Sequence, residues 1–564
     1  MPPLVECVPN FSEGRDRRII DAIAGAISET PRVRLLDVDS GADTNRTVYT
    51  FVGPPEAVGD AACNAAARAV ELIDMTRHRG AHPRLGAMDV CPFVPVADVT
   101  MDDCVGLARA VGRRIGDGLD VPVYFYECAA TSESRRSLSA IRQGEYEGLA
   151  ARLVDPAWAP DAGPRAFRPK TGAFVIGARQ FLLAYNVNLN TTDRRLAHEV
   201  ALSIRETGRI ARDDRGEPVR DEHGEPTRIP GRLKGVRAIG WYIDAYRQAQ
   251  VSINLTDFHV TPLHEVFEVV CEEARQRGLI VTGSELVGLT PIEPLLAAGR
   301  HFLGRQGKPR AAADRDLVSM AVTSLGLSQL TPFDPEAKII EYCMREPRPL
   351  VAESVDRFVD EIASASPAPG GGSTAALLGA LGAALAAMVA QLAAGKSEAA
   401  LEASTKVGER AHHVKARLVD ANDADAAAFR AVMDATRMPR GSVERDTARA
   451  CALDAAAERA TLVPLESARL CAEAAEAALD AARLGHRPSA SDAGVAALAA
   501  RAGAEAAALN VAINLPAIRD AAKRAHLHAE TDLAVRRARA AAAATLEQVA
   551  VFLPTDFLAG MRTA

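Results

Sequence analysis

The sequence predicts an α/β region followed by an all-α region: two tandem ferredoxin-like α+β subdomains and then a C-terminal helical bundle domain. The chain of 564 residues is too long for one hydrophobic core. Its composition also changes near residue 330, from alternating β-branched and helical stretches to helices rich in Ala, Leu and charged residues. We predict subdomains at 1–180 and 181–326, a linker at 327–335 and a helical domain at 336–564.

Short runs rich in Val, Ile, Phe and Tyr predict the strands of the first subdomain, and longer mixed stretches predict its helices. The order βαββαβ is that of the ferredoxin-like unit, and one more helix and strand extend it. The expected elements are a strand at 4–8, a helix at 15–29, strands at 33–39 and 47–53, a helix at 56–74, a strand at 90–96, a helix at 102–116 and a strand at 122–126.

The same order recurs in the second subdomain, so two units of like architecture with a cleft between them are expected. Its segment 212–225 is so rich in charge and glycine that it predicts a mobile surface loop. The expected elements are an extended segment at 174–187, a helix at 192–207, paired strands at 236–243 and 249–255, a helix at 262–277 and a strand at 279–281.

The last part of the chain is expected to be helical from residue 357 onward, after prolines and turn residues at 327–336. Segment 374–394 has 21 residues without a charge, which is long enough to span a bilayer. It consists mostly of Ala and Gly, which contribute little to insertion. We therefore predict a helix buried in a tight bundle and no membrane association.

Charge and cysteine content narrow the class of protein. Lys and Arg number 66 and Asp and Glu 73, and no basic cluster stands out, which argues against nucleic-acid binding. Nine widely spaced cysteines without a C-x-x-C pair predict neither a disulfide framework nor a zinc site. Residues 1–6 lack the features of a secretory signal, so a cytoplasmic protein with small-molecule or protein partners is expected.

Two motifs are similar to known binding motifs but lack residues or structure that those motifs require. Gly395-Lys396-Ser397 is similar to the end of a phosphate-binding loop, but Ala390 stands where that motif requires Gly, so no nucleotide site is predicted. His78 and His82 have the spacing of a zinc-binding helix pair, but a glycine and a proline interrupt any helix there. A zinc protease is excluded on this ground.

The loop 77–86 (RHRGAHPRLG) carries two imidazoles and the guanidiniums of Arg77, Arg79 and Arg84 before an expected strand. Such a loop holds a proton-transfer group beside anion-binding cations, or it is simply a polar surface loop. Asp37 and Asp39 end a neighbouring strand. They could orient an imidazole, hold a substrate nitrogen, or only form the following turn.

Long runs of this part resemble glutamate formimidoyltransferases. The runs are LVECVPNFSEG (4–14), LLDVDSGADTNRTVYTFVG (35–53) and RHRGAHPRLGAMDVCPFVPV (77–96), and others at 163–189, 231–241 and 283–291 extend the resemblance over residues 1–326. The resemblance implies transfer of a formimidoyl group from N-formimidoyl-L-glutamate to N5 of tetrahydrofolate. It also implies that two subdomains enclose the folate.

The resemblance assigns roles to particular residues. The family's catalytic histidine falls on His82, and Asp39 is expected to contact substrate. Positive charge in the family's folate-contacting loop would suit the glutamate tail of folate. That loop falls on Gly163, Pro164, Arg165, Ala166, Phe167, Arg168, Pro169, Lys170, Thr171 and Gly172.

Three runs of the helical part resemble formimidoyltetrahydrofolate cyclodeaminases and the related methenyltetrahydrofolate cyclohydrolases. They are PAPGGGSTAALLGALGAALAAMV (367–389), DANDADAAAFRAVMDATRMPR (420–440) and SDAGVAALAARAGAEAAALNVAINL (491–515). The combined order is similar to that of the bifunctional formimidoyltransferase-cyclodeaminase family. This family forms ring-like assemblies of dimers, so a homo-oligomer through the helical domain is implied.

The glycines before the first apolar helix suggest a second site. Gly371, Gly372 and Ser373 stand at a helix start, where free backbone N–H groups can bind a carboxylate or a pterin carbonyl. Triple glycine also permits close helix packing, and both interpretations stay open.

Polar residues on two later helices complete the expected second site. The family's catalytic carboxylate falls on Asp425, whereas Asp423 points to another helix face and is expected to be solvated. Asn510 and Asn514 share one face of an apolar helix. They could bind a pterin edge or satisfy a neighbouring helix end.

Both implied reactions need positioning and proton transfer, with tetrahydrofolate as co-substrate and no metal or nucleotide. His82 would move a proton during transfer, because an imidazole can accept and return one at neutral pH. Asp425 would protonate the departing ammonia, which requires burial to raise its pKa. Two alternatives remain: a single-activity cyclohydrolase or cyclodeaminase, and a non-catalytic folate-binding scaffold.

Overall fold

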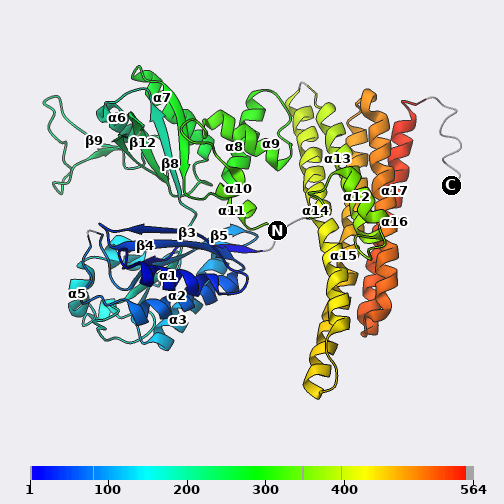
Figure 1. The fold of residues 1–564 in the computed structure, drawn as a ribbon. Coiled ribbons are helices and arrows are strands. Elements are labelled where there is room, and N and C mark those ends of the chain that lie inside the picture. Colours follow the sequence, from blue (N-terminus) through cyan, green and yellow to red (C-terminus); the bar gives the residue numbers. More distant parts are fainter. Residues whose placement is uncertain (1–2, 81, 245, 346–348, 396, 554–564) are drawn as a thin grey trace. The chain divides into compact units, whose positions relative to one another are not determined.

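The computed structural model describes residues 3–80, 82–244, 246–345, 349–395 and 397–553, so Lys396 of the excluded phosphate-loop motif lies outside it (Figure 1). Residues Met1–Ala298 and Ala321–Arg345 form one compact unit. Gly299–Met320 and Glu346–Ala564 form a second. The described sheets lie in the first unit and the long helices in the second, which confirms an α/β part followed by a helical part.

The first sheet has seven strands. β3 pairs with β4, β4 with β1, and β1 with β5, all antiparallel, and β7 and β6 continue the sheet in parallel beyond β5. The strands are β1 (Leu4–Cys7), β2 (Asn10–Phe11), β3 (Arg34–Gly41), β4 (Arg46–Gly53), β5 (Met88–Ala97), β6 (Val123–Glu127) and β7 (Phe174–Ala178).

Three helices, α1 (Arg17–Ser28), α2 (Pro55–Leu72) and α3 (Met101–Leu119), cover one face of this sheet (Figure 1). Their apolar residues form one core with alternate residues of the strands, such as Tyr49 and Phe51 of β4. Near β6 and β7 the opposite face is covered by a smaller cluster that includes α4 (Leu138–Ile141) and α5 (Glu145–Arg152). The part of that face over β3, β4 and β2 has no helix of this set on it, and the polar groups described below lie there.

The predicted extended segment 174–187 is wrong as a single element. β7 joins the first sheet, and β8 (Leu183–Leu189) belongs to the second, so the change of sheet lies between Ala178 and Leu183. The connecting residues Arg179-Gln180-Phe181-Leu182 contain neither Gly nor Pro. The sequence therefore gave no turn signal at this point.

The second sheet has the order β11-β12-β8-β13 and is antiparallel throughout. Helices α6 (Arg194–Ile204) and α7 (Leu263–Gln276) pack against it. The other strands are β11 (Val236–Ile243), β12 (Gln248–Leu255) and β13 (Val281–Val287), so the strand predicted at 279–281 begins later and runs further. In the second sheet the first strand, β8, lies between the third and the fourth, β12 and β13. In the first sheet β1 lies between β4 and β5, which is the same order when the two-residue strand β2 is left out.

The predicted surface loop 212–225 lies between two short paired strands, β9 (Arg209–Ile210) and β10 (Arg228–Ile229). It contains two copies of one turn. Asp213 accepts hydrogen bonds from two backbone N–H groups at 2.9 Å, and Asp221 does the same eight residues later. Nearly all of its side chains are exposed, as the composition predicted.

The helical unit is built from long helices whose core residues are mainly alanine. They are α12 (Val355–Ala363), α13 (Gly371–Leu392), α14 (Glu398–Arg437), α15 (Val443–Arg483), α16 (Ala490–Asn514) and α17 (Ala521–Ala550). Residues 299–320 of this unit include the end of α8 (Glu293–Arg305) and the start of α9 (Asp314–Leu325), whereas α10 (Pro335–Lys338) and α11 (Ile340–Cys343) belong to the first unit. Small side chains allow close approach, as where the Cα of Gly379 lies beside Cys471.

Two stretches of this unit are long and apolar enough to cross a membrane, Gly371–Leu392 and Arg487–Ala517. In the most apolar window of each, 56% and 39% of the residues are buried inside the protein. The first is α13, which packs against α14, α15 and α16, as the buried bundle helix predicted at 374–394 would.

Candidate functional site

The face of the first sheet that turns away from α1, α2 and α3 carries charged side chains. Val38 packs into the helix-covered core, so its neighbours Asp37 and Asp39 point to the opposite face. Asp39 lies opposite Val48 of β4, and Arg46 is two residues from Val48 on the same face. The register thus brings Asp39 and Arg46 together across neighbouring strands.

His82 lies in the loop before β5 and is partly buried, with an Nδ1 that is buried and has no hydrogen-bond partner. Burial lowers the pKa of His82, and the positive charges of Arg46 and Arg142 lower it further, against the opposing effect of Asp89. The imidazole is therefore neutral at pH 7 and can accept a proton.

The other histidine of the loop, His78, is a structural residue. It is buried, its Nε2 lies 2.8 Å from the backbone oxygen of Asn45, and its Nδ1 accepts a hydrogen bond from Arg84 Nε at 3.3 Å. Both ring nitrogens are occupied, so His78 fixes the loop that carries His82.

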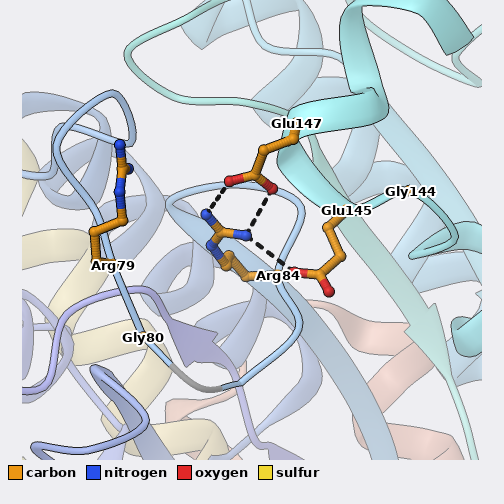
Figure 2. Close-up of a pocket in the computed structure, with 6 residues that line it drawn as sticks. All are labelled: Arg79, Gly80, Arg84, Gly144, Glu145 and Glu147. Carbon is orange, nitrogen blue, oxygen red and sulfur yellow. Dashed lines mark hydrogen bonds and ion pairs between the residues drawn. The ribbon is translucent and has the colours of Figure 1, made fainter.

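Arg84 is not the free anion-binding cation that the loop sequence predicted. Its buried guanidinium donates to Glu145 at 3.0 Å and to Glu147 at 2.6 and 2.8 Å, as Figure 2 shows. The two carboxylates neutralise it. They line a pocket of about 490 Å³ whose lining residues are Arg79, Gly80, Arg84, Gly144, Glu145 and Glu147, and His82 is not among them (Figure 2).

The cations that face His82 come from elsewhere in the chain, and the sequence analysis missed them. Arg142 forms a buried ion pair with Asp89, which also accepts a hydrogen bond from the Leu85 N–H at 2.9 Å. Arg46 donates from Nη2 to Asn10 Oδ1. The strands predicted at 33–39 and 47–53 follow each other directly, and this succession was the one signal that could have pointed to Arg46.

The loop 163–172 is joined to the His82 loop. Gly172 has a φ of +67° and forms a β-bridge with Gly86, and a Cβ there would overlap the Leu85 carbonyl, so only glycine fits. The Ala87 N–H donates to the Thr171 oxygen at 2.8 Å. At the other end of the loop, Gly163 has a φ of +74° and packs against Gly116.

The basic side chains of this loop differ in what they bind. Arg168 forms an ion pair with Asp120, so its charge is neutralised. Arg165 donates to the carbonyls of Leu153 at 3.0 Å and Val154 at 2.6 Å, and Lys170 donates to a carbonyl of α2 at 2.8 Å. Carbonyls neutralise no charge, so Arg165 and Lys170 keep theirs, and both are exposed.

A second group of candidate residues meets at the start of α13. Ser373 is buried and its hydroxyl lies 2.9 Å from the Asn422 oxygen and 3.3 Å from Asp425 Oδ2. A Cβ on Gly372 would overlap the carboxylate of Asp425, and a Cβ on Gly371 would lie 3.3 Å from Asn510 Nδ2. The glycines thus let Asp425 and Asn510 approach the backbone of the first helical turn.

Asp425 and Asp423 point in different directions, as their spacing predicted. Burial raises the pKa of Asp425 and outweighs the opposing hydrogen bonds from Ser373. Asp423 was expected to be solvated, and this is wrong: its carboxylate accepts hydrogen bonds from the N–H groups of Leu350 at 3.0 Å and Val351 at 3.4 Å. It anchors the segment that precedes α12.

The two asparagines of α16 have different hydrogen-bond partners. Asn510 lies beside Gly371, and its Nδ2 donates to the Ala506 oxygen of its own helix at 2.9 Å. Asn514 Nδ2 donates to the Ala460 oxygen of α15 at 2.7 Å. That carbonyl lacks its usual intrahelical partner because residue 464 is a proline.

No cluster of three or more His, Cys, Asp or Glu side chains that could hold a metal ion occurs among the residues that the structure describes.

Comparisons with known proteins identify one family over nearly the whole chain. Family models match in succession: the formiminotransferase domain, N-terminal subdomain, over residues 4–179, the formiminotransferase domain over residues 184–345, and formiminotransferase-cyclodeaminase over residues 354–533. A formimidoyltransferase-cyclodeaminase of Sus scrofa is 46% identical over 554 residues, covering 97% of this chain and 99% of that protein.

Two shorter relatives each match one part of the chain. A glutamate formimidoyltransferase of Streptococcus pyogenes serotype M1 is 39% identical over 303 residues, 54% of this chain and 94% of that protein. A methenyltetrahydrofolate cyclohydrolase of Methylorubrum extorquens is 41% identical over 172 residues, 30% of this chain and 83% of that protein. These findings confirm the resemblance seen in the sequence, and the chain belongs to the formimidoyltransferase-cyclodeaminase family.

Proposed function

We propose that the chain is a bifunctional folate enzyme of histidine degradation, both a transferase and a lyase. It transfers the formimidoyl group of N-formimidoyl-L-glutamate to N5 of tetrahydrofolate. It then cyclises 5-formimidoyltetrahydrofolate to 5,10-methenyltetrahydrofolate and releases ammonia. The names of the relatives support both activities. The observation that carries the proposal is that a chain similar over 97% of its length to a two-activity relative holds two separate groups of polar residues. In one, His82 has a buried Nδ1 without a hydrogen-bond partner, and in the other, Asp425 lies against the first turn of α13.

In the transfer step, N5 of tetrahydrofolate attacks the amidinium carbon of the donor and a tetrahedral intermediate forms. The neutral imidazole of His82 accepts the proton that N5 loses. It then returns this proton to the nitrogen of the departing glutamate. Asp39 lies on the adjacent open face of the sheet, where its carboxylate holds the cationic amidinium.

In the cyclisation step, N10 attacks the same carbon and the C–N bond to the departing ammonia breaks. Asp425 supplies the proton to that nitrogen, since burial keeps its carboxyl protonated to a higher pH than an exposed aspartate. Its carboxylate then takes up the proton that N10 loses, which restores the acid. Ser373 hydrogen-bonds this carboxyl through its backbone and its hydroxyl, and Gly372 lies against it. Gly371 lies beside Asn510, which binds the pterin edge. We assign Asn514 to the structural alternative, because its amide satisfies the Ala460 carbonyl.

Folate binds along the loop 163–172, where Arg165 and Lys170 offer exposed positive charge to the glutamate tail. The strand order shared by the two sheets supports ferredoxin-like subdomains, with a boundary near residue 180. For the remaining boundaries we keep the ends at residues 326 and 336 as a proposal. Cysteines without disulfides support a cytoplasmic enzyme.

The helical domain joins copies of the chain. Helices α13 and α16 pack against each other, and each leaves large apolar side chains exposed. These residues are Leu381, Met388 and Leu392 on α13 and Val495, Leu509 and Ile513 on α16. Their spacings of four, seven and fourteen residues place each set on one helix face, which suits a second copy of the chain.

One experiment tests both activities. The purified full chain is incubated with tetrahydrofolate and N-formimidoyl-L-glutamate while glutamate release, ammonia release and the methenyl chromophore are followed. All three signals are expected, with glutamate preceding ammonia. Ring closure without glutamate release would indicate a single-activity cyclodeaminase or cyclohydrolase, and no signal despite folate binding would indicate a scaffold.

A further inference from the structure

A guanidinium on the open face of the first sheet has no role in the reaction described so far. Arg46 of β4 shares that face with Asp39, because Asp39 is paired with Val48 and the side chains of a strand alternate. On the other side of β4, Asn10 is paired with the same Val48, and its Oδ1 accepts a hydrogen bond from Arg46 Nη2. The side chain of Arg46 is therefore held at one edge and oriented across the sheet.

The Nε–H of this guanidinium is unsatisfied. Nε of Arg46 and Nδ1 of His82 are both buried, and neither has a hydrogen-bond partner in the part of the chain that the structure describes. Burial lowers the pKa of Arg46, and the carboxylates of Asp89 and Asp39 oppose this effect. A buried N–H on a cation is costly to leave unpaired, so an anionic ligand oxygen would be strongly favoured there.

The neighbouring cations are already neutralised. Arg142 is paired with Asp89, and Arg84 with Glu145 and Glu147. In contrast, Arg46 and Asp39, which both lie in the described part of the chain, form no ion pair, and the Asp39 side chain is exposed. The face around His82 thus presents one positive and one negative group to a ligand.

We propose that Arg46 binds a carboxylate of N-formimidoyl-L-glutamate through its Nε edge and so holds the donor beside His82. The donor carries one amidinium and two carboxylates, which complements Asp39 and Arg46 in sign. The planar guanidinium, fixed by Asn10, suits a carboxylate oxygen better than a flexible ammonium would. This assignment rests on the proposed formimidoyl transfer. It also explains how the site would select a donor that carries two carboxylates.

The test compares the full-length wild type with Arg46→Gln, Arg46→Lys and the control Arg17→Gln, which changes an exposed arginine of α1. Glutamate release is measured while each substrate is varied in turn. Both Arg46 variants are expected to raise the KM for N-formimidoyl-L-glutamate about 10- to 100-fold and to leave the KM for tetrahydrofolate within about twofold. L-Glutamate should also become a weaker competitive inhibitor to the same extent.

The pH profile separates binding from mere support of the fold. The charged groups that face His82 are Arg46, Arg142 and Asp89. Arg46→Gln removes a positive charge, so the acid limb of kcat/KM should move to higher pH, whereas Arg46→Lys should keep the wild-type limb. If Arg46 only supported the fold, its replacement would neither raise the KM for the donor selectively nor move the acid limb of kcat/KM to higher pH.

The possible outcomes are distinct. If the wild type releases no glutamate, the proposed transfer itself fails. If the wild type is active and a folded Arg46→Lys keeps the donor KM within about twofold, or raises the KM for tetrahydrofolate in its place, the assignment of Arg46 is overturned. Thermal melting of each variant establishes that it is folded, and Arg46→Lys decides the matter if Arg46→Gln does not fold.

Discussion

At Asp425, burial and the hydrogen bonds from Ser373 act on the carboxyl in opposite directions, and burial prevails. Asp425→Asn nearly keeps the shape of the side chain but cannot carry a titrating proton. We expect ammonia release to fall about 10²- to 10⁴-fold, while glutamate release is unchanged and 5-formimidoyltetrahydrofolate accumulates. Ammonia and glutamate are measured in the same reaction, so each serves as the reference for the other.

Two other aspartates of α14 serve as controls for this prediction. Asp434 is exposed, so Asp434→Asn should change neither reaction. Asp423→Asn should lower the free energy of unfolding by about 1–2 kcal/mol, because its carboxylate accepts the Leu350 and Val351 N–H groups. If Asp423→Asn stops ammonia release in a folded protein and Asp425→Asn does not, the acid has been assigned to the wrong residue.

His82 is expected to act as a base to lower pH than an exposed histidine. Because its pKa is lowered from 6.5, the imidazole stays neutral as the pH falls to 6.5, and proton acceptance is lost only below that value. The kcat/KM for glutamate release should therefore be flat from pH 7.5 to about 6.5 and decline at lower pH.

Replacement of the imidazole should confirm the assignment. His82→Ala should reduce transfer by about 10²- to 10⁴-fold and leave ring closure intact when 5-formimidoyltetrahydrofolate is supplied. His78→Ala differs, since it should lower the melting temperature by removing the contacts to Asn45 and Arg84. An acid limb of kcat/KM that begins above pH 7 in the wild type would contradict a lowered pKa.

At the scale of single residues, a functional residue could be predicted when it stands in a contiguous motif. A contact between residues far apart in the sequence could not. His82 and Asp425 stand inside contiguous motifs, so the sequence alone was enough to propose them as catalytic residues. Arg84 stands inside such a motif too, but its carboxylate partners come 61 and 63 residues later, and no local pattern announces their pairing. Arg46 and Arg142 reach His82 only through strand register and the return of the chain after α4, which a motif cannot express.

Among the helices, α15 continues through Pro464 although proline removes one backbone donor. Asn514 of α16 supplies that donor to the Ala460 carbonyl. We expect Asn514→Ala to cost about 1–3 kcal/mol of unfolding free energy, because a buried acceptor is left unsatisfied. In a Pro464→Ala background the backbone N–H is restored, so the same Asn514→Ala change should cost much less.

Denaturant unfolding of the wild type, the two single variants and the double variant gives this coupling directly. Equal costs of Asn514→Ala in both backgrounds would show that the asparagine does not replace the missing N–H. In that case its amide would be free for the pterin edge, the alternative that the sequence left open.

The bounds of a strand were predictable where apolar and polar side chains alternate and the apolar ones are buried. They were predicted wrongly where the polar side chains of the strand form hydrogen bonds with one another. On the second sheet, Asn186 and Gln250 both donate to Glu285 Oε1 at 3.0 Å. Such a face carries hydrogen-bonded amides and a carboxylate, so β13 was not predicted beyond its first residue. Polar side chains that satisfy one another on a sheet have no periodicity that distinguishes them from a surface turn.

For the whole molecule, the two compact units predict that the α/β part and the helical part can be expressed as separate fragments, provided that the helical fragment keeps Gly299–Met320. Residues 1–345 should fold alone and release glutamate. The helical unit includes Gly299–Met320, where Arg310 N donates to Thr405 Oγ1 at 3.2 Å and Arg300 pairs with Glu409 at 3.3 Å. A fragment 349–564 loses these contacts, so it should melt several degrees below a fragment 299–564.

Both helical fragments should close the ring, since Asp425 and its neighbours lie within 349–564. Thermal melting followed by circular dichroism, together with ammonia release, checks the pair. Equal melting temperatures would show that Gly299–Met320 adds nothing to the helical unit. Aggregation of every fragment, with activity only in the full chain, would contradict independent folding.

The bridge between Gly86 and Gly172 has a consequence for the order in which substrates act. The Ala87 N–H donates to the Thr171 carbonyl oxygen at 2.8 Å, and the Ala173 N–H donates to the Leu85 carbonyl oxygen at 3.2 Å. Together with the bridge, these backbone hydrogen bonds hold the loop of His82 and the loop proposed for folate in one fixed arrangement. Folate that orders residues 163–172 also orders the base, and the donor then finds it already in place. We expect binding synergy: each substrate tightens the binding of the other by the same factor, and folate alone slows hydrogen exchange at the amides of Ala87 and Ala173.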